Sequence, residues 1–147
     1  KEEAKVLSEK LNSLLADYQM FYQNLRGLHW NIKGREFFEL HVKFEEYYTD
    51  SQLKIDEIAE RILTLGGTPL HTFTDYLETS NIKVGKNITN DVEAVNLVLT
   101  GYKQLLAIER NLLSISDEAD DEGTNAMISD FVSEQEKTLW MLNAWLG

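Results

Sequence analysis

Apolar residues recur at steps of three and four along most of this chain, which is the spacing of an amphipathic helix. The longest stripe runs through residues 36–65, and Gly66 and Gly67, followed by Pro69, predict where that helix ends. The stripe passes through Phe37, Leu40, Phe44, Tyr48, Ser51, Ile55, Ile58, Ile62 and Leu65. A similar stripe over residues 3–32 ends at Lys33 and Gly34. Because the connection between them is short, we expect these two helices to be antiparallel neighbours.

The periodicity fails between Gly66 and about Asn90, where one or two helical turns are predicted over residues 73–77. A connection of this length inside a compact domain is typical of the crossover in a four-helix bundle. A third long helix is predicted from Asp91, with Asn90 or Thr89 as its cap.

The fourth helix is predicted after an acidic break over residues 117–122, with Thr124 as its cap. No room remains for a fifth long helix. The pattern therefore predicts an all-α bundle of four helices, with a long crossover between the second and the third that carries a short helix. The length of 147 residues predicts one domain, residues 1–147.

The amino-acid composition limits which partners and metal ligands the chain can have. The net charge of −11 disfavours binding to nucleic acid or to an anionic membrane, because both need clustered Lys and Arg. Cysteine is absent, so any metal ion must be held by oxygen and imidazole ligands, and a cytoplasmic location is expected. No apolar run approaches the ~20 residues that span a membrane. The first residue is Lys1 rather than Met, which is compatible with a longer natural chain.

Four possible metal ligands lie on one flank of the helix at 36–65, beside its apolar stripe: His41, Glu45, Asp56 and Glu60. Asp56 and Glu60 are four residues apart, so their carboxylates share one helix face. His41 and Asp56 are fifteen positions apart, which is about 22 Å along a helix. Within one subunit, these two groups cannot bind the same ion.

His29 completes the pattern, since it lies five residues before Gly34 and His41 lies seven after it. Antiparallel helices joined at Gly34 bring both histidines to a similar depth, about 10 Å from the turn. The chain thus presents a histidine pair near one end of the bundle and a carboxylate pair towards the other. A two-fold axis would join such half-sites between two subunits. The Glu-x-x-His motif of ordinary di-iron bundles is absent, which disfavours a site inside one subunit.

The residues around these positions resemble the Dps family of mini-ferritins, within the ferritin-like superfamily. The resemblance is carried by RGLHWNIKG at 26–34, FFELH at 37–41, DEIAERI at 56–62 and GGTP at 66–69. It is dense from residue 25 to residue 69 and consistent over the whole length. It implies a ferritin-like bundle that assembles into a hollow dodecamer, with a ferroxidase site at each dimer interface.

The resemblance also implies roles for individual residues. His29, His41, Asp56 and Glu60 would be the ligands for iron, as Fe(II) and then Fe(III). Glu45 would supply a further carboxylate, with a solvated surface residue as the alternative. Iron would be oxidised by hydrogen peroxide or dioxygen and stored as ferric mineral inside the shell. Acidic residues early in the fourth helix would line three-fold pores for cations, and Asp121 and Asp130 are the candidates.

Other interpretations remain beside this one. Trp30 is interpreted as a packing residue near the site, although it could absorb a stray oxidising equivalent, and His71 as a structural residue of the crossover. The acidic break at 117–122 could simply be a solvated loop. Instead of a ferroxidase, the protein could be a nucleoid-compacting shell or a purely structural helical oligomer. Because Lys1, Lys5 and Lys10 are the only basic residues near the start, we expect no appreciable DNA binding unless a further tail supplies it.

Overall fold

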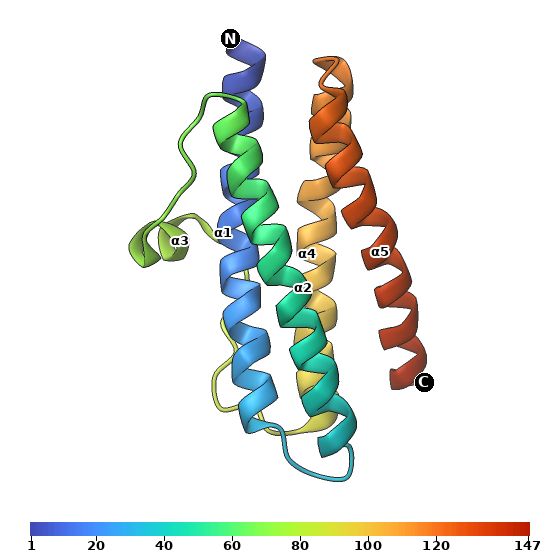
Figure 1. Ribbon diagram of the computed structural model, residues 1–147. Coiled ribbons are helices and arrows are strands. Elements are labelled where there is room, and N and C mark those ends of the chain that lie inside the picture. Colours follow the sequence, from blue (N-terminus) through green and yellow to red (C-terminus); the bar gives the residue numbers. More distant parts are fainter.

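The computed structural model describes residues 1–147 and contains five helices and no strand. They are α1 (Glu2–Asn31), α2 (Phe37–Thr64), α3 (Phe73–Thr79), α4 (Asp91–Glu118) and α5 (Glu122–Leu146). Figure 1 shows α1 and α2 antiparallel, a crossover that carries the short α3, then α4 parallel to α2, and α5 returning beside α4. The predicted all-α bundle with its crossover and short helix is confirmed. No helix has the length and the apolar character that crossing a bilayer requires.

Local sequence accounts for the helix ends. Gly66 has a φ of +88°, and the N–H of Gly67 donates to the carbonyl of Ile62 at 2.9 Å, which is the Schellman arrangement that ends α2. Asn90 caps α4, because its side chain accepts a hydrogen bond from the N–H of Glu93. The prediction that Thr124 caps the fourth helix is wrong. The cap is Asp121, whose side chain accepts from the N–H of Thr124, so α5 already begins at Glu122.

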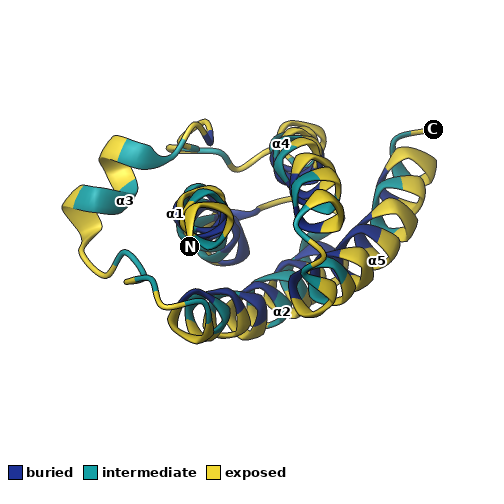
Figure 2. Ribbon diagram, turned by 90° about the horizontal axis from the view of Figure 1, so that it is seen from above, coloured by how far each residue is buried: buried dark blue, intermediate teal, exposed yellow.

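The core lies between the four long helices, and Figure 2 shows their buried residues facing one another while α3 lies outside α1. Its largest fully buried side chains include Tyr18, Phe21 and Phe44. Phe21 meets Tyr102 edge to face at 4.7 Å between ring centroids, which joins α1 to α4. Two ionic contacts join α2 to α5: Lys54 with Glu134 at 2.8 Å, and Arg61 with Asp121 at 2.7 Å.

Polar residues of α1 hold the crossover in place. Asp17, which is 2% exposed, accepts hydrogen bonds from the Ser80 hydroxyl and from the N–H of Asn81. Asn24 donates to the carbonyl of Lys83 and accepts from the N–H of Gly85. The backbone of the crossover lacks regular hydrogen bonds here, and Asp17 and Asn24 of α1 supply hydrogen-bond partners for it at two positions.

We predict that Asn24→Ala lowers the free energy of unfolding by about 1–3 kcal/mol, because it leaves a part-buried carbonyl and N–H of the crossover without partners. Chemical denaturation followed by circular dichroism measures the change. Asn143→Ala is the matched control, since the exposed Asn143 side chain bonds only to its own helix, and a change within about 0.5 kcal/mol is expected there. Equal losses in the two variants would contradict this role for Asn24.

Candidate metal centre

Two histidines join α1 to α2, because the ring of each one forms a hydrogen bond with the backbone carbonyl of the other. His29, near the end of α1, places its Nδ1 atom 2.5 Å from the carbonyl oxygen of His41. His41, in the first turns of α2, places its Nδ1 atom 2.7 Å from the carbonyl oxygen of His29. The two rings stack at 3.8 Å between centroids, with 10° between their planes. The short turn after α1 therefore brings together the two histidines that the sequence spacing placed at one depth.

These bonds determine which ring nitrogen is free. A carbonyl oxygen only accepts hydrogen bonds, so the neutral rings carry their hydrogen on Nδ1. Nε2 of each ring then keeps its lone pair, which is the form of histidine that binds metal ions. A second hydrogen-bond partner that fixes the tautomer and orientation is also what metal-binding histidines normally have.

Aromatic neighbours restrict the rings further. Phe37 stacks on the His41 ring at 4.8 Å, and Tyr48 meets the His29 ring edge to face at 5.4 Å. Sequence patterning assigned Phe37 and Tyr48 only to the apolar stripe, so it missed this supporting role. Both lie within two turns of His41 on α2, and that proximity was the only available signal.

Glu45 is the carboxylate nearest to the pair. Its Oε1 atom lies 3.9 Å from Nε2 of His29, and its side chain is 57% exposed. The His29 side chain is only 10% exposed, so the contact lies at the surface end of an otherwise buried ring. One carboxylate and two imidazoles are a mixed oxygen and nitrogen ligand set suited to Fe(II).

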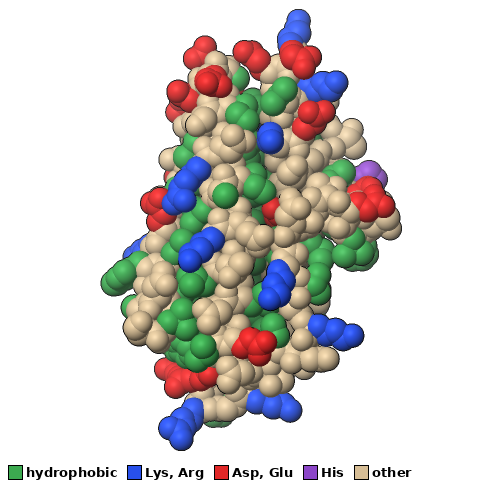
Figure 3. All heavy atoms as spheres, turned by 180° about the vertical axis from the view of Figure 1, so that it is seen from behind, with side chains coloured by type: hydrophobic (Ala, Val, Ile, Leu, Met, Phe, Trp, Pro, Cys, Tyr) green, Lys and Arg blue, Asp and Glu red, His purple; other side chains and the backbone are tan.

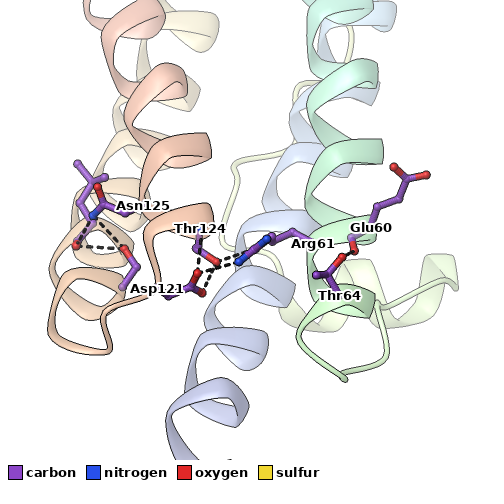
Figure 4. Close-up of polar contacts among 8 residues, drawn as sticks. Glu60, Arg61, Thr64, Asp121, Thr124 and Asn125 are labelled. Atoms are coloured by element: carbon purple, nitrogen blue, oxygen red, sulfur yellow. Dashed lines mark hydrogen bonds and ion pairs between the residues drawn. The ribbon is translucent and has the colours of Figure 1, made fainter.

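Asp56 and Glu60 lie farther along α2, and both are exposed. Figure 4 shows the Glu60 side chain pointing away from the bundle, while Arg61, the next residue, turns towards α5. No group of three or more His, Asp or Glu side chains within the single chain is arranged to hold a metal ion. The structure thus pairs His29 with His41 and places Glu45 beside His29, while Asp56 and Glu60 lie farther along α2.

The carboxylates share their face of α2 with large apolar side chains. We call this face the outer stripe of α2: it consists of Phe38, Val42, Glu45, Thr49, Leu53, Asp56, Glu60 and Leu63. Its four apolar members are between 52% and 81% exposed. A shallow groove lined by Val42, Glu45, Thr49 and Leu53, together with Glu46 and Asp50, crosses its middle. Apolar residues exposed in such a row mark an interaction surface.

Asp121, a candidate for a cation pore, is engaged within its own chain. It caps α5, accepts a 2.5 Å hydrogen bond from the Thr124 hydroxyl, and pairs with Arg61 (Figure 4). Burial opposes the ionisation of Asp121, but the hydrogen bonds from Thr124 and the Arg61 guanidinium outweigh it and lower its pKa. Asp130, the other pore candidate, is exposed on α5. Figure 3 shows acidic side chains gathered at the end of the bundle that holds the N-terminus and the turn between α4 and α5.

Trp30 and His71, the other two residues that the sequence analysis singled out, lie at the surface. Trp30 is 57% exposed, and its ring is covered by the Arg26 guanidinium at 5.0 Å, so it has no place in the core of this chain. His71 is exposed in the crossover and contacts the carbonyl of Pro69 at 3.0 Å.

Comparisons with known proteins agree on one family. The ferritin-like domain family matches residues 8–147. A "DNA protection during starvation protein" of Porphyromonas gingivalis is 44% identical over 135 residues, which are 92% of this chain and 85% of that protein. The crystal structure of a Dps protein from Vibrio cholerae, described as a ferritin-like diiron-carboxylate protein, superposes with a TM-score of 0.98 at 51% identity and covers 99% of this chain and 92% of that one.

A third structure bears on the histidines. It is a Listeria innocua Dps variant in which two histidines are changed to glycine, and it matches with a TM-score of 0.93 at 26% identity over 96% of this chain and 94% of that one. Those two histidines are 12 positions apart, the same separation as His29 and His41.

We predict that His29→Ala and His41→Ala are energetically coupled in the metal-free protein. Each change removes the stacked partner and frees one carbonyl, and should lower the free energy of unfolding by about 1–3 kcal/mol. The double variant should lose less than the sum of the two single losses, by about 0.5–3 kcal/mol, because either change alone already removes the ring stacking. Denaturation of the three variants gives this coupling. His71→Ala serves as the uncoupled control, and strictly additive effects would refute the interlocked pair.

Proposed function

The chain belongs to the Dps family of ferritin-like proteins, and from that membership we propose that it is a ferroxidase that oxidises Fe(II) and stores ferric iron in a hollow homo-oligomeric shell, a dodecamer. The observation that carries this proposal is the outer stripe of α2. It presents Glu45, beside the histidine pair, and the carboxylates of Asp56 and Glu60 on one exposed face, among apolar side chains suited to burial against a second subunit. Each iron site would form where two subunits meet.

The positions along α2 support a two-fold pairing. The midpoint of this helix lies between Asp50 and Ser51. If two copies of α2 pair antiparallel about that point, residues equidistant from it face each other: His41 faces Glu60, Glu45 faces Asp56, and Phe38 faces Leu63. His41 and Glu60 each lie about 14 Å from the midpoint.

The same pairing supplies both halves of a site. One subunit contributes the Nε2 atoms of His29 and His41 together with Glu45, and its partner contributes Asp56 and Glu60. Glu45 and the partner's Asp56 would bring like charges together, which a bound cation stabilises. Apolar contact between Phe38 and the partner's Leu63 would close the outer end of each site.

The chemistry follows from the ligands. Fe(II) is the substrate: imidazole and carboxylate bind it, and the anionic carboxylates favour the Fe(III) product. Two Fe(II) ions each lose one electron, and one hydrogen peroxide molecule takes both electrons and two protons to give two water molecules. Because both electrons are used together, little hydroxyl radical escapes. Dioxygen is the alternative oxidant. The stacked histidines keep their Nε2 lone pairs at fixed positions throughout.

Ferric ions would then mineralise inside the shell. We assign cation entry to acidic residues near the start of α5, with Asp130 as the exposed candidate. Asp121 would act there mainly by holding the helix start against Arg61.

Subunit mixing tests where the site lies. One variant carries His29→Ala and His41→Ala, and the other carries Asp56→Asn and Glu60→Gln. Loss of even a supporting group at a metal site lowers activity about 10–100-fold, so each variant alone should oxidise Fe(II) with peroxide at least about tenfold more slowly than the natural chain. After the two are unfolded together and reassembled, half of the dimers are mixed, and each mixed dimer has one complete site. About one quarter of the sites should therefore recover.

The controls in this experiment separate its outcomes. His71→Ala should oxidise Fe(II) at the unchanged rate, since His71 lies in the crossover away from the stripe. A site contained in one chain could not be restored by mixing, so the absence of recovery with intact assemblies would rule out the shared site. Full activity in both double variants would rule out the ferroxidase itself.

We predict no retardation of duplex DNA in a gel shift at moderate salt. The alternative function, a shell that protects DNA, is suggested by the names of relatives such as the Porphyromonas gingivalis protein. A net charge of −11 repels the phosphate backbone, and the basic residues are spread over the surface (Figure 3). A shift that disappears as salt is raised would favour the DNA-binding function instead.

A further inference from the structure

A polar cluster lies in the middle of the bundle core and receives one side chain from each long helix: Tyr18 of α1, Lys54 of α2, Glu109 of α4 and Gln135 of α5. All four are at most 4% exposed. The Tyr18 hydroxyl donates to Oε2 of Glu109 at 2.5 Å, and the Gln135 amide donates to the Tyr18 oxygen. Nothing in the proposed iron chemistry uses this cluster.

The cluster has too few hydrogens for its acceptors. Oε1 of Glu109 and Oε1 of Gln135 are both buried without a hydrogen-bond partner. Buried acceptors are rarely left unpaired, because each such atom is destabilising by about 1–3 kcal/mol. The pattern indicates that something positively charged or hydrogen-bearing belongs at this point.

No spare cation faces Glu109. Lys54 already pairs with two carboxylates, Asp50 at 2.7 Å and Glu134 at 2.8 Å. Arg110, the next residue on α4, pairs with Glu136 at 3.1 Å on the exposed side. Tyr102, the other titratable side chain nearby, is neutral. An ionised Glu109 would therefore be a buried charge without a counter-ion of its own, which is strongly unfavourable.

A metal ion is a poor occupant on chemical grounds. Ferritin-like bundles that hold metal in their cores use carboxylates and Glu-x-x-His pairs from the four helices. This cluster has one fully buried carboxylate, Glu109, and no histidine, while Lys54 brings a positive charge to the same level. A proton is the smallest occupant, and it turns one unpaired acceptor into a donor.

We propose that Glu109 is held as a neutral carboxylic acid in the native protein, and that this buried proton makes the stability of the bundle depend on pH. Burial raises the pKa of Glu109 to about 8, although the hydrogen bond from Tyr18, the nearby Gln135 amide and the charges of Lys54 and Arg110 act to lower it. The stabilisation is fully present below the ordinary pKa of a glutamic acid. It is lost as the pH rises through about 8, because the unfolded chain releases this proton at lower pH than the native one.

Infrared difference spectroscopy of the assembled protein tests for the proton directly. A carbonyl stretch of a protonated carboxylic acid should be present at about pH 6, shift in heavy water, and vanish as the pH rises through about 8. The band should be missing from Glu109→Gln and retained in Glu136→Gln, an exposed glutamate of the same neighbourhood. Absence of the band in the natural chain at about pH 6 would overturn the proposal.

A second variant keeps the proposal testable if Glu109→Gln folds poorly. Lys54→Met removes the nearest positive charge, so the band should persist to higher pH than in the natural chain. A band lost at the same or lower pH would contradict the charge arrangement. Where Glu109→Gln does fold, its unfolding midpoint should fall less between about pH 5 and about pH 8 than that of the natural chain. An equal fall in both would show that Glu109 is not the linked group.

Discussion

A straight helix fixes the distance between its residues, and that constraint governs how this protein can bind metal. His41 and the pair of Asp56 and Glu60 lie on one rigid helix, α2, about 22 Å or more apart. No rotamer or loop movement can close such a gap. Three of the four proposed ligands lie on this one helix, but a single chain cannot bring them together, so the proposed function requires oligomerisation.

The histidine half of the proposed site depends on a different interaction. The turn between α1 and α2 is short enough for each imidazole to reach the backbone carbonyl of the other histidine. Stacking between Phe37, His41 and His29 then leaves the rings little freedom. This half is organised before any metal binds, whereas Asp56 and Glu60 are exposed and free to adjust. Rigid histidines and adjustable carboxylates would suit a site that binds iron as Fe(II) and releases it as Fe(III).

The hydrophobic pattern of the sequence predicted most of the fold and part of the candidate site. The stripes, Gly66 and Asn90 gave the long helices and their ends within a residue or two, because each signal is local. The start of α5 was misjudged because the acidic residues 117–122 resembled a break, whereas Asp120 takes the left-handed turn at a φ of 56° and Asp121 makes the cap. Spacing predicted that His29 and His41 would meet, but not that each would bind the other's carbonyl. Helix patterning did not single out Lys54 or Glu109, since nothing local indicates which charged residue faces a core.

The contrast between core and surface explains why the metal chemistry would lie outside the bundle. A core site needs several inward carboxylates, and each would carry the desolvation penalty that Glu109 already shows. Here Lys54 is neutralised by Asp50 and Glu134 at the edge of the core. Tyr18 donates a hydrogen bond to Glu109, and Gln135 donates one to Tyr18. The interior is thus stabilised without metal. The carboxylates on the outer stripe of α2 are exposed in the single subunit. Their burial against a second subunit would therefore coincide with the arrival of the cation.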